Sequence, residues 1–256
     1  MTTTYAPGQP NWVDLATTNP AEASSFYGQL FGWTTENLGP EAGGYSLLRL
    51  GGRQVGGVGP VMDPMSPPSW NVYLDSDNVD DTAEKVTANG GSIAMSPMDV
   101  MDAGRMAMFI DPTGAVFGVW QPGRTRGAEV MNEPGAMSWA ELMTTDVGIA
   151  KNFYHNVFPV DVRDVPIANG NTYTLLETAG QSVAGAMQIT PDMGAIPPHW
   201  APYFEVEDRD GVADRAIALG ATEQVRMDVD AGRLAMLIDP QGASFNIINS
   251  NPDYAP

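Results

Sequence analysis

The chain has 256 residues, with 31 acidic and 12 basic side chains, and a formal net charge of −19. This charge repels nucleic acid, and no basic stripe offsets it, so we expect no nucleic-acid partner. The absence of cysteine excludes disulfides and thiolate-bound metals. The first residues have no basic region or apolar run, and no segment reaches membrane-spanning length. We therefore expect a cytoplasmic protein with no membrane partner, and export without a leader is the alternative.

Periodicity predicts an alternation of strands and helices along the first half. Period-two alternation marks strands and apolar residues at helical spacing mark helices. The first helix begins at Pro20, with Asn19 as its N-cap, and is stopped by Gly32. The predicted strands are residues 11–17, 45–50, 54–62, 70–74 and 93–95, and the predicted helices are residues 20–31 and 79–89.

A repeated segment divides the chain into two halves. DAGRMAMFIDPTGAVF at residues 102–117 returns as DAGRLAMLIDPQGASF at residues 230–245, with 12 of 16 positions identical. Each copy predicts a β-hairpin around a D-P-x-G turn. We predict a first domain at residues 1–122, a linker at 123–136 and a second domain at 137–256. Each domain would hold two modules, at residues 10–62 and 69–121, and at 137–190 and 199–250.

The modules resemble the vicinal-oxygen-chelate superfamily, which includes glyoxalase I, bleomycin-resistance proteins and extradiol dioxygenases. The resemblance rests on FY-x-x-x-F helices, W-x-D/E-L first strands and GR-x-A-M-x-I-DP-x-GA hairpins. The chain is similar above all to the tandem, glyoxalase-like actinobacterial members of this superfamily that are labelled "hydroxylase". The resemblance implies an α+β fold of four βαβββ modules, with curled mixed sheets whose concave faces form cavities.

The same resemblance implies a divalent metal on the concave face, but the expected ligand positions suit one poorly. Carried over from the family's motifs, these positions are Trp12, Trp70 and Gly118 in the first half, and Trp139, Trp200 and Asn246 in the second. Trp and Gly side chains offer no lone pair. The chain has only two histidines, of which His155 is expected to be exposed. We therefore expect no metal cofactor, with a divalent metal held by Asp14 or Glu141 as the alternative.

Aromatic side chains would line the cavity instead. The resemblance directs the four strand tryptophans inward, and aromatic walls suit a flat or apolar molecule; the competing interpretation is that they fill the core. The expected ligand-binding residues are Trp12, Trp70, Tyr73, Arg105, Phe117, Trp139, Trp200, Tyr203, Arg233 and Phe245.

Three side chains are candidates for acid–base chemistry: Glu141, His199 and Asp14. Asp14 and Glu141 lie two residues beyond a Trp, hence on its strand face. A carboxylate among aromatic walls can serve as a base, or it can pair with Arg105 or Arg233.

These observations predict a small-molecule-binding protein or a metal-independent lyase, isomerase or hydrolase, acting as monomer or homodimer. The alternatives are a drug-sequestering resistance protein and a metal-dependent lyase, isomerase or dioxygenase.

Overall fold

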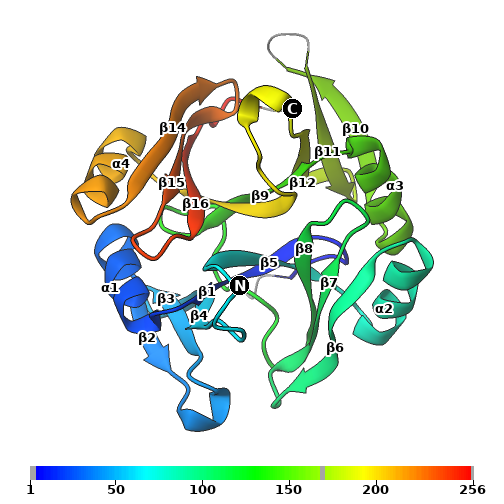
Figure 1. Ribbon diagram of the computed structural model, residues 1–256, viewed down its shortest axis with the longest axis horizontal. Helices are drawn as coiled ribbons and strands as arrows, with labels where there is room; N and C mark the ends of the chain where they lie inside the picture. The colour runs from blue at the N-terminus through cyan, green and yellow to red at the C-terminus, as the bar shows by residue number, and fades with distance from the viewer. Residues whose placement is uncertain (1–3, 168–170, 255–256) are drawn as a thin grey trace. The chain divides into compact units, whose positions relative to one another are not determined.

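The computed structural model describes residues 4–167 and 171–254, whose strands form two eight-stranded mixed sheets (Figure 1). The strand orders are β2-β3-β4-β1-β5-β8-β7-β6 and β10-β11-β12-β9-β13-β16-β15-β14. The strands of the first sheet are β1 (Pro10–Thr17), β2 (Thr34–Asn37), β3 (Ser46–Leu50), β4 (Arg53–Pro60), β5 (Ser69–Asp75), β6 (Ser92–Val100), β7 (Gly104–Ile110) and β8 (Val116–Pro122). Those of the second are β9 (Met137–Thr144), β10 (Asp161–Pro166), β11 (Thr172–Thr178), β12 (Gln181–Gln188), β13 (His199–Glu205), β14 (Thr222–Val229), β15 (Gly232–Ile238) and β16 (Ser244–Ser250).

In the described part of the chain, four α-helices complete four βαβββ modules, which confirms the predicted α+β class. They are α1 (Pro20–Phe31), α2 (Val79–Ala88), α3 (Val147–Val157) and α4 (Arg209–Ala218). The predicted cap at the start of α1 is present: the Asn19 side chain accepts the Glu22 N–H at 3.3 Å. Gly32 ends the helix in the left-handed conformation, with φ of 75°. None of the helices among the described residues is long and apolar enough to cross a membrane.

The repeated segments form the two predicted hairpins, β7–β8 and β15–β16. In the first, Asp111 Oδ1 accepts the backbone N–H groups of Thr113, Gly114 and Ala115 at 2.8–3.0 Å. In the second turn, Asp239 Oδ1 accepts the backbone N–H groups of Gln241 and Ala243 at 2.9 Å. The aspartate of each D-P-x-G motif therefore stabilises its own turn through side-chain-to-backbone hydrogen bonds.

The contacts divide the chain into two compact units, and each unit combines modules from both halves of the sequence. The first unit comprises residues 1–12, 72–127 and 139–200, and the second comprises residues 13–71, 128–138 and 201–256. Helices α2 and α3 lie side by side in the first unit, and α1 and α4 in the second (Figure 1). The division at residues 122 and 137 stays a prediction. Part of the predicted linker is packed, because Ala128, Val130 and Ala136 are at most 3% exposed.

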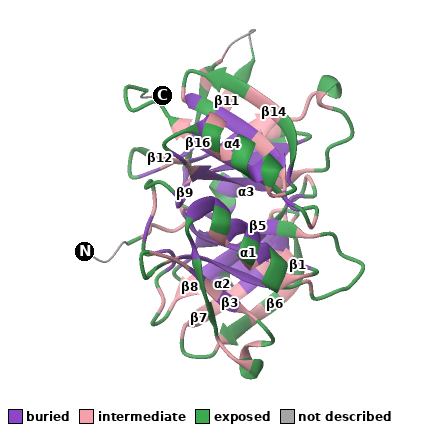
Figure 2. Cartoon of the chain, turned by 90° about the vertical axis from the view of Figure 1, so that its left-hand side faces the viewer, coloured by how far each residue is buried: buried purple, intermediate pink, exposed green. Residues whose placement is uncertain are grey.

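Aromatic rings form the core of each unit, and each core draws on both halves of the chain. In the first unit, Phe117 of β8 contacts Phe153 and Tyr154 of α3, with ring centroids 6.0 and 5.5 Å apart. In the second unit, Phe245 of β16 contacts Phe26 and Tyr27 of α1, with centroids 6.0 and 5.3 Å apart. Figure 2 shows the buried residues along strands such as β5 and β9, and exposed residues in the loops.

Candidate functional site

Alternation along β5 separates the sheet face under the helices from the face away from them. The Trp70 ring meets Tyr27 of α1 edge-on, with centroids 5.3 Å apart, so Trp70 points toward the helix. The next residue, Asn71, points the opposite way. Asn71 donates to Asp14 of β1, which places Asp14 on the same side as Asn71. We call this side the helix-free face.

Asp14 is the centre of a polar cluster on the helix-free face of the first sheet. It is 9% exposed, and its two oxygens accept hydrogen bonds from Asn71 Nδ2 at 2.9 Å and from the Tyr45 hydroxyl at 3.2 Å. Gly57 lies opposite Asp14 in the β1–β4 register. A Cβ at Gly57 would stand 1.8 Å from the Tyr45 oxygen, so only glycine lets the tyrosine reach the carboxylate.

Glu141 occupies the equivalent place in the second sheet and is 7% exposed. It lies opposite Gly185, above which the Tyr173 hydroxyl passes so closely that a Cβ would stand 1.9 Å away. Here the tyrosine oxygen accepts the Trp139 indole N–H at 2.8 Å. The tyrosine-over-glycine arrangement is therefore duplicated in the two sheets.

Sequence reasoning missed Tyr45, Tyr173 and Asn71 as members of these clusters. A signal existed for the tyrosines, because Tyr45 and Tyr173 are 128 residues apart, the period of the repeat. Tyr45 directly precedes β3, and Tyr173 is the second residue of the matching strand β11. Asn71 had no such signal, since it follows Trp70 and is replaced by Ala201 in the second half.

The other predicted residues of this face are buried or bonded locally. Trp12 is 8% exposed and lies on the strand face of Asp14. Tyr73 is 5% exposed and packs on Gly118, its partner in the β5–β8 register. Tyr203 is 4% exposed and lies opposite Asn246, a predicted ligand position. His199 begins β13, and its Nδ1 lies 2.8 Å from the Pro197 carbonyl oxygen.

A buried aspartate–tyrosine–tryptophan chain stands on the helix side of the first unit. The Trp200 indole donates to the Tyr154 hydroxyl at 2.8 Å, and that hydroxyl donates to Asp111 Oδ2 at 3.0 Å. Burial, followed by the charge of Asp111, raises the pKa of Tyr154 well above its usual value. The tyrosine therefore stays neutral and donates its proton to the turn aspartate.

The second unit contains the same chain. The Trp70 indole donates to the Tyr27 hydroxyl at 2.9 Å, which donates to Asp239 Oδ2 at 3.0 Å. Burial first, and then Asp239, raises the pKa of Tyr27 in the same way. Each chain joins the hairpin turn of one half to the FY helix of the other.

These chains correct the placement of four residues predicted to line a cavity. Trp70 and Trp200 are at most 5% exposed and point into the helix-side core. Phe117 and Phe245 are at most 1% exposed and pack on α3 and α1. Of the four strand tryptophans, only Trp12 and Trp139 share a strand face with a candidate carboxylate.

The predicted ion pairs of Arg105 and Arg233 with Asp14 or Glu141 are also corrected. Arg105 binds Asp80 and Asp99, each at 2.9 Å. Arg233 binds Asp210 at 2.5 Å. The acidic partners are 42–74% exposed, so these pairs lie at the surface, and the two arginines are not placed beside the carboxylates of the helix-free face.

The donor set of the Asp14 cluster does not suit a divalent metal. Both oxygens of Asp14 face hydrogen-bond donors, an amide N–H and a phenol O–H. Metal sites need several lone pairs directed at one point. Within residues 4–167 and 171–254, no group of three or more His, Cys, Asp or Glu residues stands close enough to hold an ion.

Sequence comparison connects this architecture to known proteins. Residues 9–119 match the model of the Glyoxalase/Bleomycin resistance protein/Dioxygenase superfamily. CFP32 of Mycobacterium tuberculosis, a protein named as a glyoxylase, is 40% identical over 97% of both chains. The anthracycline biosynthesis protein DnrV of Streptomyces peucetius is 37% identical, with 98% of this chain and 97% of that protein covered.

Solved structures show the same fold at low sequence identity. A Mn(II)-bound glyoxalase from Novosphingobium aromaticivorans has a TM-score of 0.65 at 16% identity, covering 95% of this chain and 82% of that one. The 2,3-dioxygenase LapB from Pseudomonas sp. KL28 has a TM-score of 0.64 at 14% identity, covering 99% and 97%. The chain belongs to the glyoxalase/bleomycin resistance/dioxygenase, or vicinal-oxygen-chelate, superfamily.

Proposed function

We propose that the chain binds a flat aromatic or carbonyl-bearing small molecule on the helix-free faces of its sheets, without a metal. The observation that carries the proposal is the buried Asp14, which is held by Tyr45 and Asn71 on the strand face that also bears Trp12. A few placed polar groups beside an aromatic side chain are typical of small-molecule sites. Two Streptomyces relatives take their names from anthracycline biosynthesis, which supports an aromatic ligand.

Acid–base chemistry on the bound molecule is the second candidate function. It is favoured by Glu141, which is 7% exposed and lies on the strand face of Trp139. A buried carboxylate can take a proton from a carbon beside a carbonyl. Asp14 and His199 are the other candidate groups. Simple sequestration of a drug would use the same face without this step.

We expect metal removal to leave ligand binding unchanged. Mass spectrometry of purified protein should find no stoichiometric transition metal. The reason is that the Asp14 oxygens already accept hydrogen bonds from Tyr45 and Asn71, so their lone pairs are not directed at a common metal position. Its tryptophan fluorescence should be quenched by 1,4-dihydroxyanthraquinone with the same affinity before and after EDTA treatment, and its unfolding temperature should not move. One equivalent of tightly held Fe, Mn, Ni or Zn, whose removal abolishes quenching, would contradict the proposal.

We also expect Tyr45→Phe to weaken binding of this probe about threefold to tenfold. The ring still covers Gly57, but Asp14 loses the hydrogen bond from the Tyr45 hydroxyl, and a hydrogen bond is worth about 0.5–1.5 kcal/mol net. Titration of tryptophan fluorescence measures the change. Tyr254→Phe is the matched control, since Tyr254 is 37% exposed near the chain end. Equal affinities in the two variants would exclude Asp14 from the binding site.

A further inference from the structure

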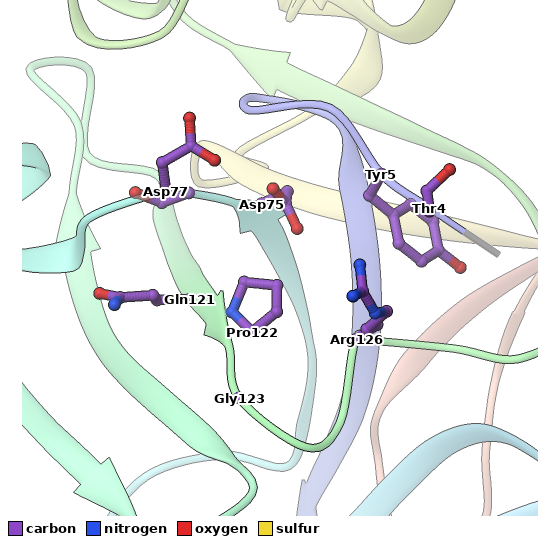
Figure 3. A pocket seen from close by; sticks show the side chains of 9 residues that line it. Thr4, Tyr5, Asp75, Asp77, Gln121, Pro122, Gly123 and Arg126 are labelled. Atoms are coloured by element: carbon purple, nitrogen blue, oxygen red, sulfur yellow. The ribbon is translucent and has the colours of Figure 1, made fainter. Parts of the chain in front are cut away.

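A second polar site lies in the first unit, at the ends of β5 and β8. It is a cavity of about 270 Å³ whose lining includes Asp75, Asp77, Gln121, Tyr5 and Arg126. In the view of Figure 3, the two aspartates lie at the top, Gln121 lies at the left, and Tyr5 and Arg126 lie at the right. The volume falls just below the range of pockets for drug-sized ligands, roughly 300–1,000 Å³, so a smaller molecule fits.

Asp75 is the buried charge of this cavity. It is 3% exposed, and its Oδ1 accepts a hydrogen bond from Asn11 Nδ2 at 2.8 Å. Burial raises the pKa of Asp75 to about 6; the Asn11 bond opposes this shift and the nearby Asp77 adds to it. A cation in the cavity would relieve this cost.

Arg126 supplies the opposite charge on the cavity wall. Arg124, two residues earlier, pairs with Asp102, whereas Arg126 forms no ion pair with any carboxylate of residues 4–167 or 171–254. Tyr5 lies beside it in Figure 3. Burial, and then Asp75, raises the pKa of Tyr5, so its hydroxyl stays protonated.

We propose that this cavity binds a small zwitterion, with its ammonium group between Asp75 and Asp77 and its carboxylate on Arg126. Two carboxylates beside one guanidinium disfavour a phosphate or another dianion. A metal is disfavoured because Asp75 and Asp77 are the only carboxylates among the lining residues, and a hard cation needs more oxygen ligands. The ligand class is therefore a free amino acid or an ω-amino acid. This site is separate from the helix-free face, so its test does not depend on the function proposed above.

A series of ω-amino acids tests the proposal and measures the separation of the charges. Glycine, β-alanine, γ-aminobutyrate and 5-aminovalerate would be titrated into the full chain by calorimetry and NMR. The best member should bind at least tenfold tighter than propylamine or butyrate, which carry one charge each. Binding of none of the four, or equal binding of the single-charge compounds, would overturn the proposal.

Two charge-removing variants assign the two ends of the ligand. Asp75→Asn keeps the side-chain size and the acceptor for Asn11, and should weaken the best zwitterion about tenfold to a hundredfold, as expected for a lost charged hydrogen bond. Arg126→Gln should do the same, but without changing propylamine binding. Asp81→Asn and Arg124→Gln are the matched controls, because both residues are exposed and outside the lining. Equal losses in variant and control would overturn the assignment.

The pH dependence separates Asp75 from its neighbours. Since an ammonium group pairs with the ionised carboxylate, affinity should be full above pH 7 and fall as pH drops through about 6, the pKa of Asp75. Asp77, Tyr5 and Arg126 also face the site, so the fall in affinity must disappear in Asp75→Asn; its persistence would overturn the role of Asp75.

Because the raised pKa costs folding stability above pH 6, Asp75→Asn should unfold at a higher temperature than the wild type at pH 7.5. The difference should close by pH 4. If Asp75→Asn does not fold, Arg126→Gln decides the proposal alone.

Discussion

Asp111→Ala lowers the free energy of unfolding by about 3–5 kcal/mol, the range expected when several buried hydrogen bonds lose one shared partner. Asp111 is 3% exposed. Its Oδ1 accepts three backbone N–H groups and the Thr113 hydroxyl, and its Oδ2 accepts the Tyr154 hydroxyl. Alanine leaves the turn donors and the buried phenol without an acceptor. Urea unfolding followed by tryptophan fluorescence measures the loss.

Substitutions of other residues in the aspartate–tyrosine–tryptophan hydrogen-bond network measure the contribution of its individual bonds. Tyr154→Phe should lower the free energy of unfolding by about 1–2 kcal/mol. It removes the hydrogen bond from the Tyr154 hydroxyl to Asp111 and leaves the Trp200 indole N–H unpaired. Asp239→Ala should cost less than Asp111→Ala, since the turn of Asp239 has Gln241 in place of Thr113 and lacks the hydroxyl bond. Asp81→Ala, at an exposed position of α2, is the control. If Asp111→Ala lowered the free energy of unfolding no more than this control, the hydrogen-bond network would not stabilise the fold.

The repeat, the hairpins and the caps could be predicted because local chemistry determines them. Pro20 after Asn19, and Gly at the fourth position of each D-P-x-G turn, restrict the backbone wherever they occur. β2 was not predicted, because all four of its residues are exposed and it carries no apolar alternation. It is a strand only because β3 pairs with it.

The tryptophan faces show where pattern reasoning went wrong. On β5, Trp70 alternates with Asn71 and shares its face with Val72 and Leu74, which are at most 1% exposed. On β1, by contrast, Val13 has the core face and Trp12 the other. Alternation gives relative faces within a strand, but the apolar partners decide which face meets the helices. Reading these partners would have placed Trp70 and Trp200 in the core.

The pairing of opposite halves could not be predicted from the sequence. Tyr154 and Asp111 are 43 residues apart, and Tyr27 and Asp239 are 212 apart. A duplicated sequence makes each FY helix chemically compatible with either hairpin turn, because both turns carry the same aspartate. The choice is made by packing of whole modules, for which a single sequence contains no local signal.

Glu141→Gln weakens binding of 1,4-dihydroxyanthraquinone more than Asp14→Asn does, by about tenfold to a hundredfold against a smaller loss. The two carboxylates hold equivalent strand positions but differ in their surroundings. Asp14 is engaged by two donors of the second unit, Tyr45 and Asn71. In the other copy, Ala201 replaces Asn71, so this amide donor is missing there.

The difference follows from the length and the charge of the two side chains. Glutamate reaches one methylene further than aspartate, and Gln keeps its size while removing the charge, so packing is preserved. Fluorescence titration gives both affinities, and urea unfolding of both variants checks that neither loss is a loss of folding. Asp161→Asn, an exposed change of the same charge, is the control. A larger loss from Asp14→Asn would show that the ligand binds more strongly at the first sheet, where Tyr45 and Asn71 hold Asp14.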